Sequence, residues 1–195
     1  MHFVNFNVFT AGLECFEGMK AYKSLSNSSD VLLFRPELNM ERLINSMNRL
    51  QMPTEDIQIS ELLSCIKKLV HLDQDWIPYG EGYSLYLRPT VICTDPYLGL
   101  APPKQLLLYV ITSPVGPYYS NKRFNPVRLT CDSNDIRAWP GGTGSSKIGG
   151  NYGPTIRASA LAMKSGFDQV LWLFGDNDEI TEVGSMVRLF DKCNE

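Results

Sequence analysis

A lysine in a glycine-rich run is the first residue whose type and place could do chemistry. Lys147 stands in the run PGGTGSSKIGG of residues 140–150. Glycine lets a backbone approach a ligand closely, and a deprotonated lysine amine can form a Schiff base with an aldehyde cofactor. Alone the signal is weak, because most lysines in such runs are only solvated. A phosphate-binding P-loop is excluded, because that motif needs glycine directly before the lysine and Ser146 stands there.

A second candidate pair lies on a predicted strand. Residues 84–93 read as a strand with two distinct faces, made irregular by Pro89. Tyr86 and Arg88 are two residues apart, so their side chains share one face. The planar guanidinium of an arginine matches a carboxylate and offers nothing to an apolar side chain.

The elements that must position these residues follow from apolar periodicity. Asn39 is a good helix N-cap, the apolar residues after it recur at helical spacing, and Pro53 closes that segment. Ser60 is expected to cap the next helix. Strands are predicted over 18–22, 31–34, 106–112 and 127–131, with a hairpin loop over 24–30.

The amino-acid composition of the chain changes after residue 131. A polar stretch and the glycine-rich run come first, then a helix from Pro154 to about Lys164 that Gly166 ends, and a hairpin of strands 169–174 and 179–183. We therefore predict an α/β (α+β) fold in two parts. Residues 1–131 form a small α+β domain, 132–143 an interdomain loop, and 144–195 a second domain.

Composition argues against several classes of protein. The net charge is −3 with no basic block, which argues against nucleic-acid binding, and the apolar stretches are too short to span a bilayer. Five cysteines without a C-x-x-C pair and only two histidines predict reduced thiols and no metal site. The first fifteen residues lack Lys and Arg, so we expect a cytoplasmic protein, or a mitochondrial one if a targeting segment is missing.

Blocks in a fixed order then carry a family resemblance. They are FEGMKAY at 16–22, LNMER at 38–42, LYLRP at 85–89, SPVGPY at 113–118, RAW at 137–139, KIGGNYG at 147–153, LWLFG at 171–175 and ITEVG at 180–184. Together they resemble the branched-chain amino-acid aminotransferases, pyridoxal-phosphate enzymes of fold type IV. The resemblance implies a homodimer built from a small N-terminal α+β domain and a larger cofactor-binding domain.

The resemblance also implies roles for single residues. Lys147 corresponds to the lysine that holds pyridoxal 5'-phosphate as a Schiff base and then carries protons between the substrate Cα and the cofactor. Tyr152 would hydrogen-bond the phenolic oxygen of the cofactor, and Glu182 would pair with its pyridine nitrogen. Arg42 would bind the phosphate from the first turn of its helix, where the helix dipole favours anions.

The implied reaction moves an amino group from leucine, isoleucine or valine to 2-oxoglutarate, giving branched-chain 2-oxo acids and glutamate by a ping-pong route. Tyr86 and Arg88 resemble the pair that meets the substrate carboxylate, and the arginine reads the distal carboxylate of glutamate. Phe16, Gly18 and Tyr118 match positions that line the side-chain pocket. For these three residues, simple core packing stays an open alternative.

Two departures from the family pattern stand out. Ala11 replaces the tyrosine expected before the FEG block, and the likeness ends at Met186. We therefore expect an incomplete second domain and poor activity of this chain alone. Two alternatives stay open: a truncated non-catalytic product, and another enzyme of this fold, either a D-amino-acid aminotransferase or aminodeoxychorismate lyase. The blocks LYLRP and GGNYG argue against that other enzyme.

Overall fold

A computed structural model describes residues 11–27, 29–97, 99–117, 126–131 and 134–184. Contacts between these residues divide them into two compact units. The first contains the described residues up to 117 together with 146–149, and the second contains the other described residues. Lys147 therefore packs with elements that precede it by a hundred residues or more.

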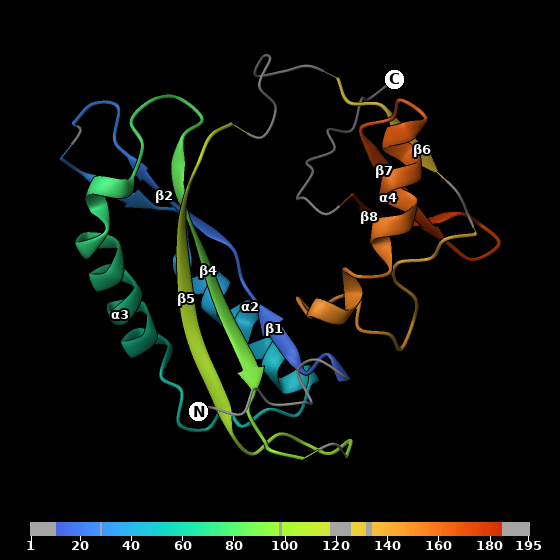
Figure 1. Cartoon of the computed structure of the whole chain (residues 1–195), viewed down its shortest axis with the longest axis horizontal. Coiled ribbons are helices and arrows are strands. Elements are labelled where there is room, and N and C mark those ends of the chain that lie inside the picture. Colours follow the sequence, from blue (N-terminus) through green and yellow to red (C-terminus); the bar gives the residue numbers. More distant parts are fainter. Residues whose placement is uncertain (1–10, 28, 98, 118–125, 132–133, 185–195) are drawn as a thin grey trace. The chain divides into compact units, whose positions relative to one another are not determined.

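The first unit is built on a five-stranded antiparallel sheet (Figure 1). Its strands are β1 (Glu14–Phe16), β2 (Met19–Lys23), β3 (Val31–Leu33), β4 (Ser84–Cys93) and β5 (Leu106–Val115). β4 lies at the centre: β5 pairs with its whole length, while β1 and β2 share its other edge. The predicted strand over 84–93 is confirmed, and Pro89 does not interrupt it.

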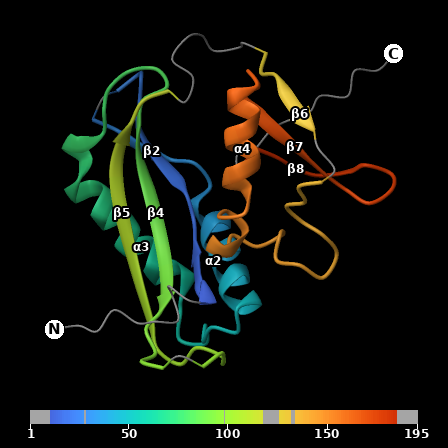
Figure 2. The same ribbon diagram turned by 45° about the vertical axis from the view of Figure 1, so that its right-hand side comes forward.

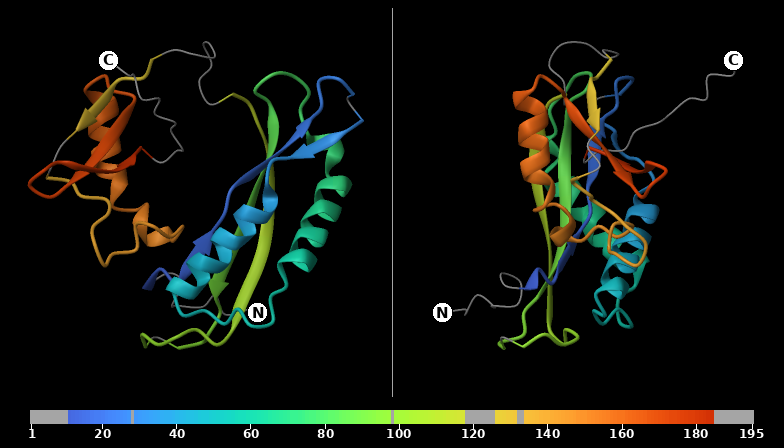
Figure 3. Two further views of the ribbon diagram at one scale, coloured as in Figure 1. Left: turned by 180° about the vertical axis from the view of Figure 1, so that it is seen from behind. Right: turned by 90° about the vertical axis from the view of Figure 1, so that its right-hand side faces the viewer.

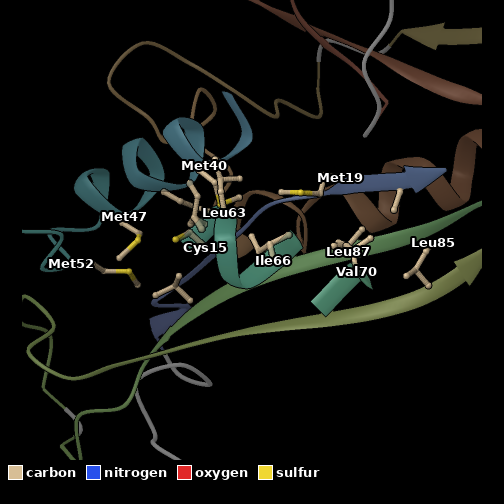
Figure 4. Packing of buried hydrophobic residues seen from close by; sticks show 14 of the residues in the cluster. Cys15, Met19, Met40, Met47, Met52, Leu63, Ile66, Val70, Leu85 and Leu87 are labelled. Atoms are coloured by element: carbon tan, nitrogen blue, oxygen red, sulfur yellow. The ribbon is translucent and has the colours of Figure 1, made fainter. Parts of the chain in front are cut away.

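Two helices, α2 (Pro36–Arg49) and α3 (Ile59–Leu72), cover one face of this sheet, as the left view of Figure 3 shows. A short 3-10 turn, η1 (Gln74–Trp76), follows α3. Side chains from both helices and from the sheet make one core (Figure 4). Met40, Leu43 and Met47 of α2 are completely buried there. Truncating such a side chain to alanine typically costs about 2–5 kcal/mol of stability.

Alternation along the strands places the candidate residues away from the helices. Leu85 and Leu87 of β4 are completely buried in the core. Tyr86 and Arg88 between them therefore point to the opposite face of the sheet. Phe16 on β1 stands next to the core residue Cys15 and belongs to that same face, opposite the helices.

Both predicted helix caps are wrong. α2 begins at Pro36, three residues before Asn39, because the fixed φ of proline suits the first helical position. α3 begins at Ile59, so Ser60 lies inside the helix, and neither helix has a side-chain cap. As a consequence Arg42 is the seventh residue of α2, and the prediction that it lies in the first turn is wrong.

The second unit contains β6 (Leu129–Cys131), α4 (Thr155–Lys164), β7 (Gln169–Phe174) and β8 (Glu179–Val183). β6 runs parallel to β7, and β8 pairs antiparallel to β7 through the predicted hairpin. Figure 2 shows α4 beside these strands, and the 3-10 turn η2 (Gly149–Asn151) precedes the helix. A small core joins Ala158 and Ala162 of α4 to Val170 and Trp172 of β7.

Candidate active site

The ring of Phe16 is where two cationic side chains of the first unit meet. Lys147 Nζ lies 4.9 Å and Arg88 Cζ lies 4.5 Å from the centroid of this ring. A cation over an aromatic face is stabilised by the ring quadrupole. An amine and a guanidinium are thus held beside the same apolar surface.

The backbone of Lys147 is attached to β1. Its carbonyl oxygen accepts the N–H of Phe16 at 3.0 Å. The next residue, Ile148, forms an antiparallel bridge with Cys15 and is buried in the core of the first unit. This pairing between segments far apart in the sequence fixes where the lysine side chain starts.

Tyr86 and Arg88 contact each other, as expected for residues two apart on one face of a strand. Arg88 Nη2 donates to the hydroxyl oxygen of Tyr86 at 2.8 Å, and Arg88 Cζ lies 5.1 Å from the tyrosine ring. The Nε of Arg88 is buried and has no hydrogen-bond partner among the described residues. An unmatched buried donor costs roughly 1–3 kcal/mol, so this nitrogen suits an anionic ligand that supplies the acceptor.

Gly18 makes room for that pair. A Cβ at this position would overlap the hydroxyl of Tyr86. A side chain at this position would therefore displace the phenol from the place where it contacts Arg88. In the structure, Gly18 leaves space for the Tyr86 hydroxyl to approach its backbone closely. Its role in the substrate pocket stays a prediction.

Arg42 is oriented by a buried carboxylate. Glu17 is 0% exposed, and it accepts hydrogen bonds from Arg42 Nε and, at 2.8 Å, from Arg42 Nη2. Asn39 Nδ2 donates to the same carboxylate at 2.8 Å, and the N–H of Gly18 does so at 3.1 Å. The Arg42 side chain is 49% exposed, so its guanidinium is fixed at the surface of the unit. This ion pair fixes the direction of the Arg42 side chain, and the predicted phosphate-binding role of Arg42 stays a prediction.

In the second unit, Arg137 links Tyr152 and Glu182. Its Nη1 lies 3.3 Å from Glu182 Oε2, and its Cζ lies 5.7 Å from the centroid of the Tyr152 ring. The Arg137 side chain is buried, and Glu182 on β8 is one-third exposed. The structure thus brings two predicted cofactor contacts to the same arginine.

Two hydrogen bonds connect the glycine-rich run to Asn151, the residue before Tyr152. The buried side chain of Asn151 donates to the carbonyl oxygen of Thr143 at 2.8 Å and accepts from the Thr143 hydroxyl at 2.6 Å. These two bonds within the second unit fix the start of the segment that carries Tyr152.

Sequence reasoning missed Glu17, Asn39 and Arg137 as functional positions. Glu17 carried a usable signal, since it is a charged residue between the apolar Phe16 and the compact Gly18. Arg137 has no local signal beyond its place in the block RAW at 137–139. Tyr118, predicted to line the substrate pocket, lies outside the described residues.

The comparisons with known proteins decide the family. Residues 14–195 match the family model described as amino-transferase class IV. The chain belongs to the class IV aminotransferases. This family includes enzymes with the predicted fold type, and the mixed architecture of helices and sheets agrees with it.

The chain is similar to branched-chain-amino-acid aminotransferases. It is 49% identical over 174 residues to the cytosolic enzyme of Ovis aries, covering 89% of this chain and 44% of that protein. It is 51% identical over 174 residues to the mitochondrial enzyme of Bos taurus, covering 89% of this chain and 43% of the relative. The chain therefore spans about half the length of the curated relatives it matches.

Two solved structures of a T.th. branched-chain amino acid aminotransferase share the fold of this class IV chain. The complex with pyridoxamine 5'-phosphate gives a TM-score of 0.73 at 25% identity, covering 91% of this chain and 55% of that one. The complex with N-(5'-phosphopyridoxyl)-L-glutamate gives 0.66 at 26% identity, covering 86% and 50%. Within the described ranges of our chain, no helix has the length and apolar character needed to cross a membrane.

Proposed function

We propose that this chain carries the small domain and part of the cofactor site of a transaminase acting on leucine, isoleucine and valine with 2-oxoglutarate. The observation that carries the proposal is the meeting of Lys147 and Arg88 at Phe16. An amine beside a guanidinium whose buried Nε is an unmatched donor suits a substrate that carries a carboxylate. The ligands of the two T.th. structures, a pyridoxamine phosphate and a phosphopyridoxyl-glutamate, support the same assignment.

Four residues, two in each unit, have side chains whose chemistry suits pyridoxal 5'-phosphate. Lys147 supplies the amine, and the half-exposed guanidinium of Arg42, fixed by Glu17, suits a phosphate. Tyr152 supplies a phenol and Glu182 a carboxylate in the second unit, both beside Arg137. When bound, the cofactor supplies an electron sink for the negative charge that develops at the substrate Cα.

The side chains of the chain would divide the work as follows. Within each half-reaction, Lys147 Nζ would carry a proton between the substrate Cα and the cofactor. Tyr86 and Arg88 would meet the substrate carboxylate, and Arg88 would read the distal carboxylate of glutamate and 2-oxoglutarate. Phe16 and Gly18 would line the space for a branched apolar side chain, and the same role for Tyr118 stays a prediction from the family resemblance.

An absorbance titration tests the proposal. Adding pyridoxal 5'-phosphate to the purified chain is expected to produce a long-wavelength band that Lys147→Ala abolishes. Leucine and 2-oxoglutarate should then give glutamate only slowly in a coupled assay, because we expect poor activity of this chain alone. A wild-type spectrum identical to that of Lys147→Ala would contradict the proposed site.

The proposal also covers the oligomeric state, the domain limits and the cellular location of the protein. We propose a homodimer, following the family resemblance, which sedimentation at several concentrations tests. The domain limits at residues 131 and 144 stay a prediction that limited proteolysis tests. The relatives include cytosolic and mitochondrial proteins, so the cytoplasmic location stays a prediction for cell fractionation.

A further inference from the structure

A buried serine joins the backbones of Arg42 and Lys147. Ser46 lies four residues after Arg42 on α2 and is 1% exposed. Its hydroxyl donates to the carbonyl oxygen of Arg42, with 3.0 Å between the oxygens. The same Oγ accepts the backbone N–H of Lys147 at 2.9 Å. All three residues belong to the first unit.

The chemistry of the hydroxyl explains why serine stands here. A serine inside a helix commonly donates to the carbonyl four residues earlier. That bond fixes the hydrogen of Ser46 on Arg42 and leaves the oxygen lone pairs for the N–H of Lys147. Serine is a poorer helix former than alanine. Helix stability and the apolar neighbours on this face, Leu43 and Met47, therefore do not account for the residue.

The backbone of Lys147 is thereby fixed by two hydrogen bonds, one to each of two elements. Ser46 of α2 holds its N–H, and Phe16 of β1 donates to its carbonyl oxygen at 3.0 Å. The two peptide groups that flank the lysine Cα are therefore each fixed to an element that borders the candidate site. Displacing a reacting group by about 1 Å can reduce a reaction rate about 100-fold, so this anchoring matters for the proposed chemistry.

We propose that Ser46 is a positioning residue that sets Lys147 relative to α2 and hence to Arg42. The Ser46 hydroxyl then connects Lys147, whose amine would bond to the cofactor aldehyde, to α2. This helix carries Arg42, whose guanidinium would bind the cofactor phosphate. The roles of Lys147 and Arg42 rest on the proposed function, whereas the two hydrogen bonds of Ser46 do not.

Two substitutions separate positioning from packing. Ser46→Ala removes the hydroxyl, while Ser46→Cys keeps the side-chain size but offers only a weak sulfur acceptor. Asn45→Ala, at the neighbouring exposed position of α2, is the matched control. Amide hydrogen exchange of the 195-residue chain, followed by NMR without cofactor, reports on the N–H of Lys147 directly.

We expect the Lys147 amide to exchange roughly three- to tenfold faster in both Ser46 variants, which is the effect of losing one net hydrogen bond. Core amides of β4 serve as the reference for overall stability and should change less. Asn45→Ala should leave the Lys147 amide unchanged. Equal exchange in wild type and Ser46→Cys, or a change spread evenly over β4, would overturn the proposal and leave Ser46 as a packing residue.

A second measurement connects the contact to the cofactor. In chain mixed with pyridoxal 5'-phosphate, cyanoborohydride trapping at Lys147 is expected to slow several-fold in both Ser46 variants and not in Asn45→Ala. If wild type is not trapped at all, the proposed function fails, and the exchange data still decide the role of Ser46. If wild type is trapped and both Ser46 variants react at its rate, the positioning role is wrong.

Discussion

At the scale of single residues, the site depends on charged groups whose partners lie close in space. Glu17 is fully buried yet carries a carboxylate, because Arg42, Asn39 and the N–H of Gly18 all donate to it. Breaking a buried ion pair is costly, since it leaves one partner with an unmatched group. Here the exposed side of Arg42 lowers that cost.

We predict that Glu17→Gln lowers the free energy of unfolding by about 1–3 kcal/mol. The amide would place an N–H group against the donors of Arg42 and Asn39, and the guanidinium would lose its fixed direction. Urea denaturation measures the change in stability, and a cofactor titration measures the weaker phosphate binding that should accompany it. Glu41→Gln removes an exposed carboxylate from the same helix and should change neither. If both variants unfold alike, Glu17 does not hold Arg42.

Arg88 is predicted to govern the use of 2-oxoglutarate more than the use of leucine. Its guanidinium can pair with a distal carboxylate and gains nothing from an apolar side chain. In cofactor-loaded protein, Arg88→Ala should slow the glutamate half-reaction roughly 10- to 100-fold, the value of a charge-assisted hydrogen bond, and the leucine half-reaction much less. Arg35→Ala, which removes an exposed arginine, is the control. Equal losses in both half-reactions would count against this role.

At the scale of elements, the strands were predicted better than the helix starts. Two-residue alternation located β4, and the turn residues located the hairpin of β7 and β8. The predicted cap Asn39 lies inside α2, and its side chain instead donates to Glu17 and to the carbonyl oxygen of Gly18. A local pattern cannot show that a distant carboxylate competes for a capping residue.

The strand β1 carries a thiol that the fold makes unreactive. Burial raises the pKa of Cys15 from 9.0 to about 12, and the nearby carboxylates of Glu14 and Glu17 act in the same direction. Because the pKa in the folded state is the higher one, the stabilising contribution of the protonated thiol is complete below pH 9 and is lost as pH rises towards 12.

We therefore predict that iodoacetamide at about pH 8 modifies the exposed Cys65 and Cys131 and spares Cys15. Peptide mass spectrometry measures the extent of modification at each position over time. Unfolding in urea should make all three thiols react, which serves as the control for accessibility. Alkylation of Cys15 in the native chain at the rate of Cys65 would show that β1 is not packed as described.

At the scale of the whole molecule, the sequence predicted the α+β architecture and most of the candidate residues. It could not predict that residues 146–149 pack with the first unit. That assignment depends on the bonds of Lys147 to Phe16 and to Ser46, each formed across a long separation in the chain. Periodicity and spacing describe neighbours in sequence, so the contacts that place the lysine became visible only in the folded chain.

The central claim is that Lys147 is the residue that bonds to pyridoxal 5'-phosphate. Borohydride reduction of the cofactor-loaded chain, followed by peptide mapping, tests this most directly, because reduction makes the bond permanent at whichever lysine formed it. We predict a single pyridoxyl label on the peptide that contains Lys147. A label on another lysine, with Lys147 unmodified, would contradict the account.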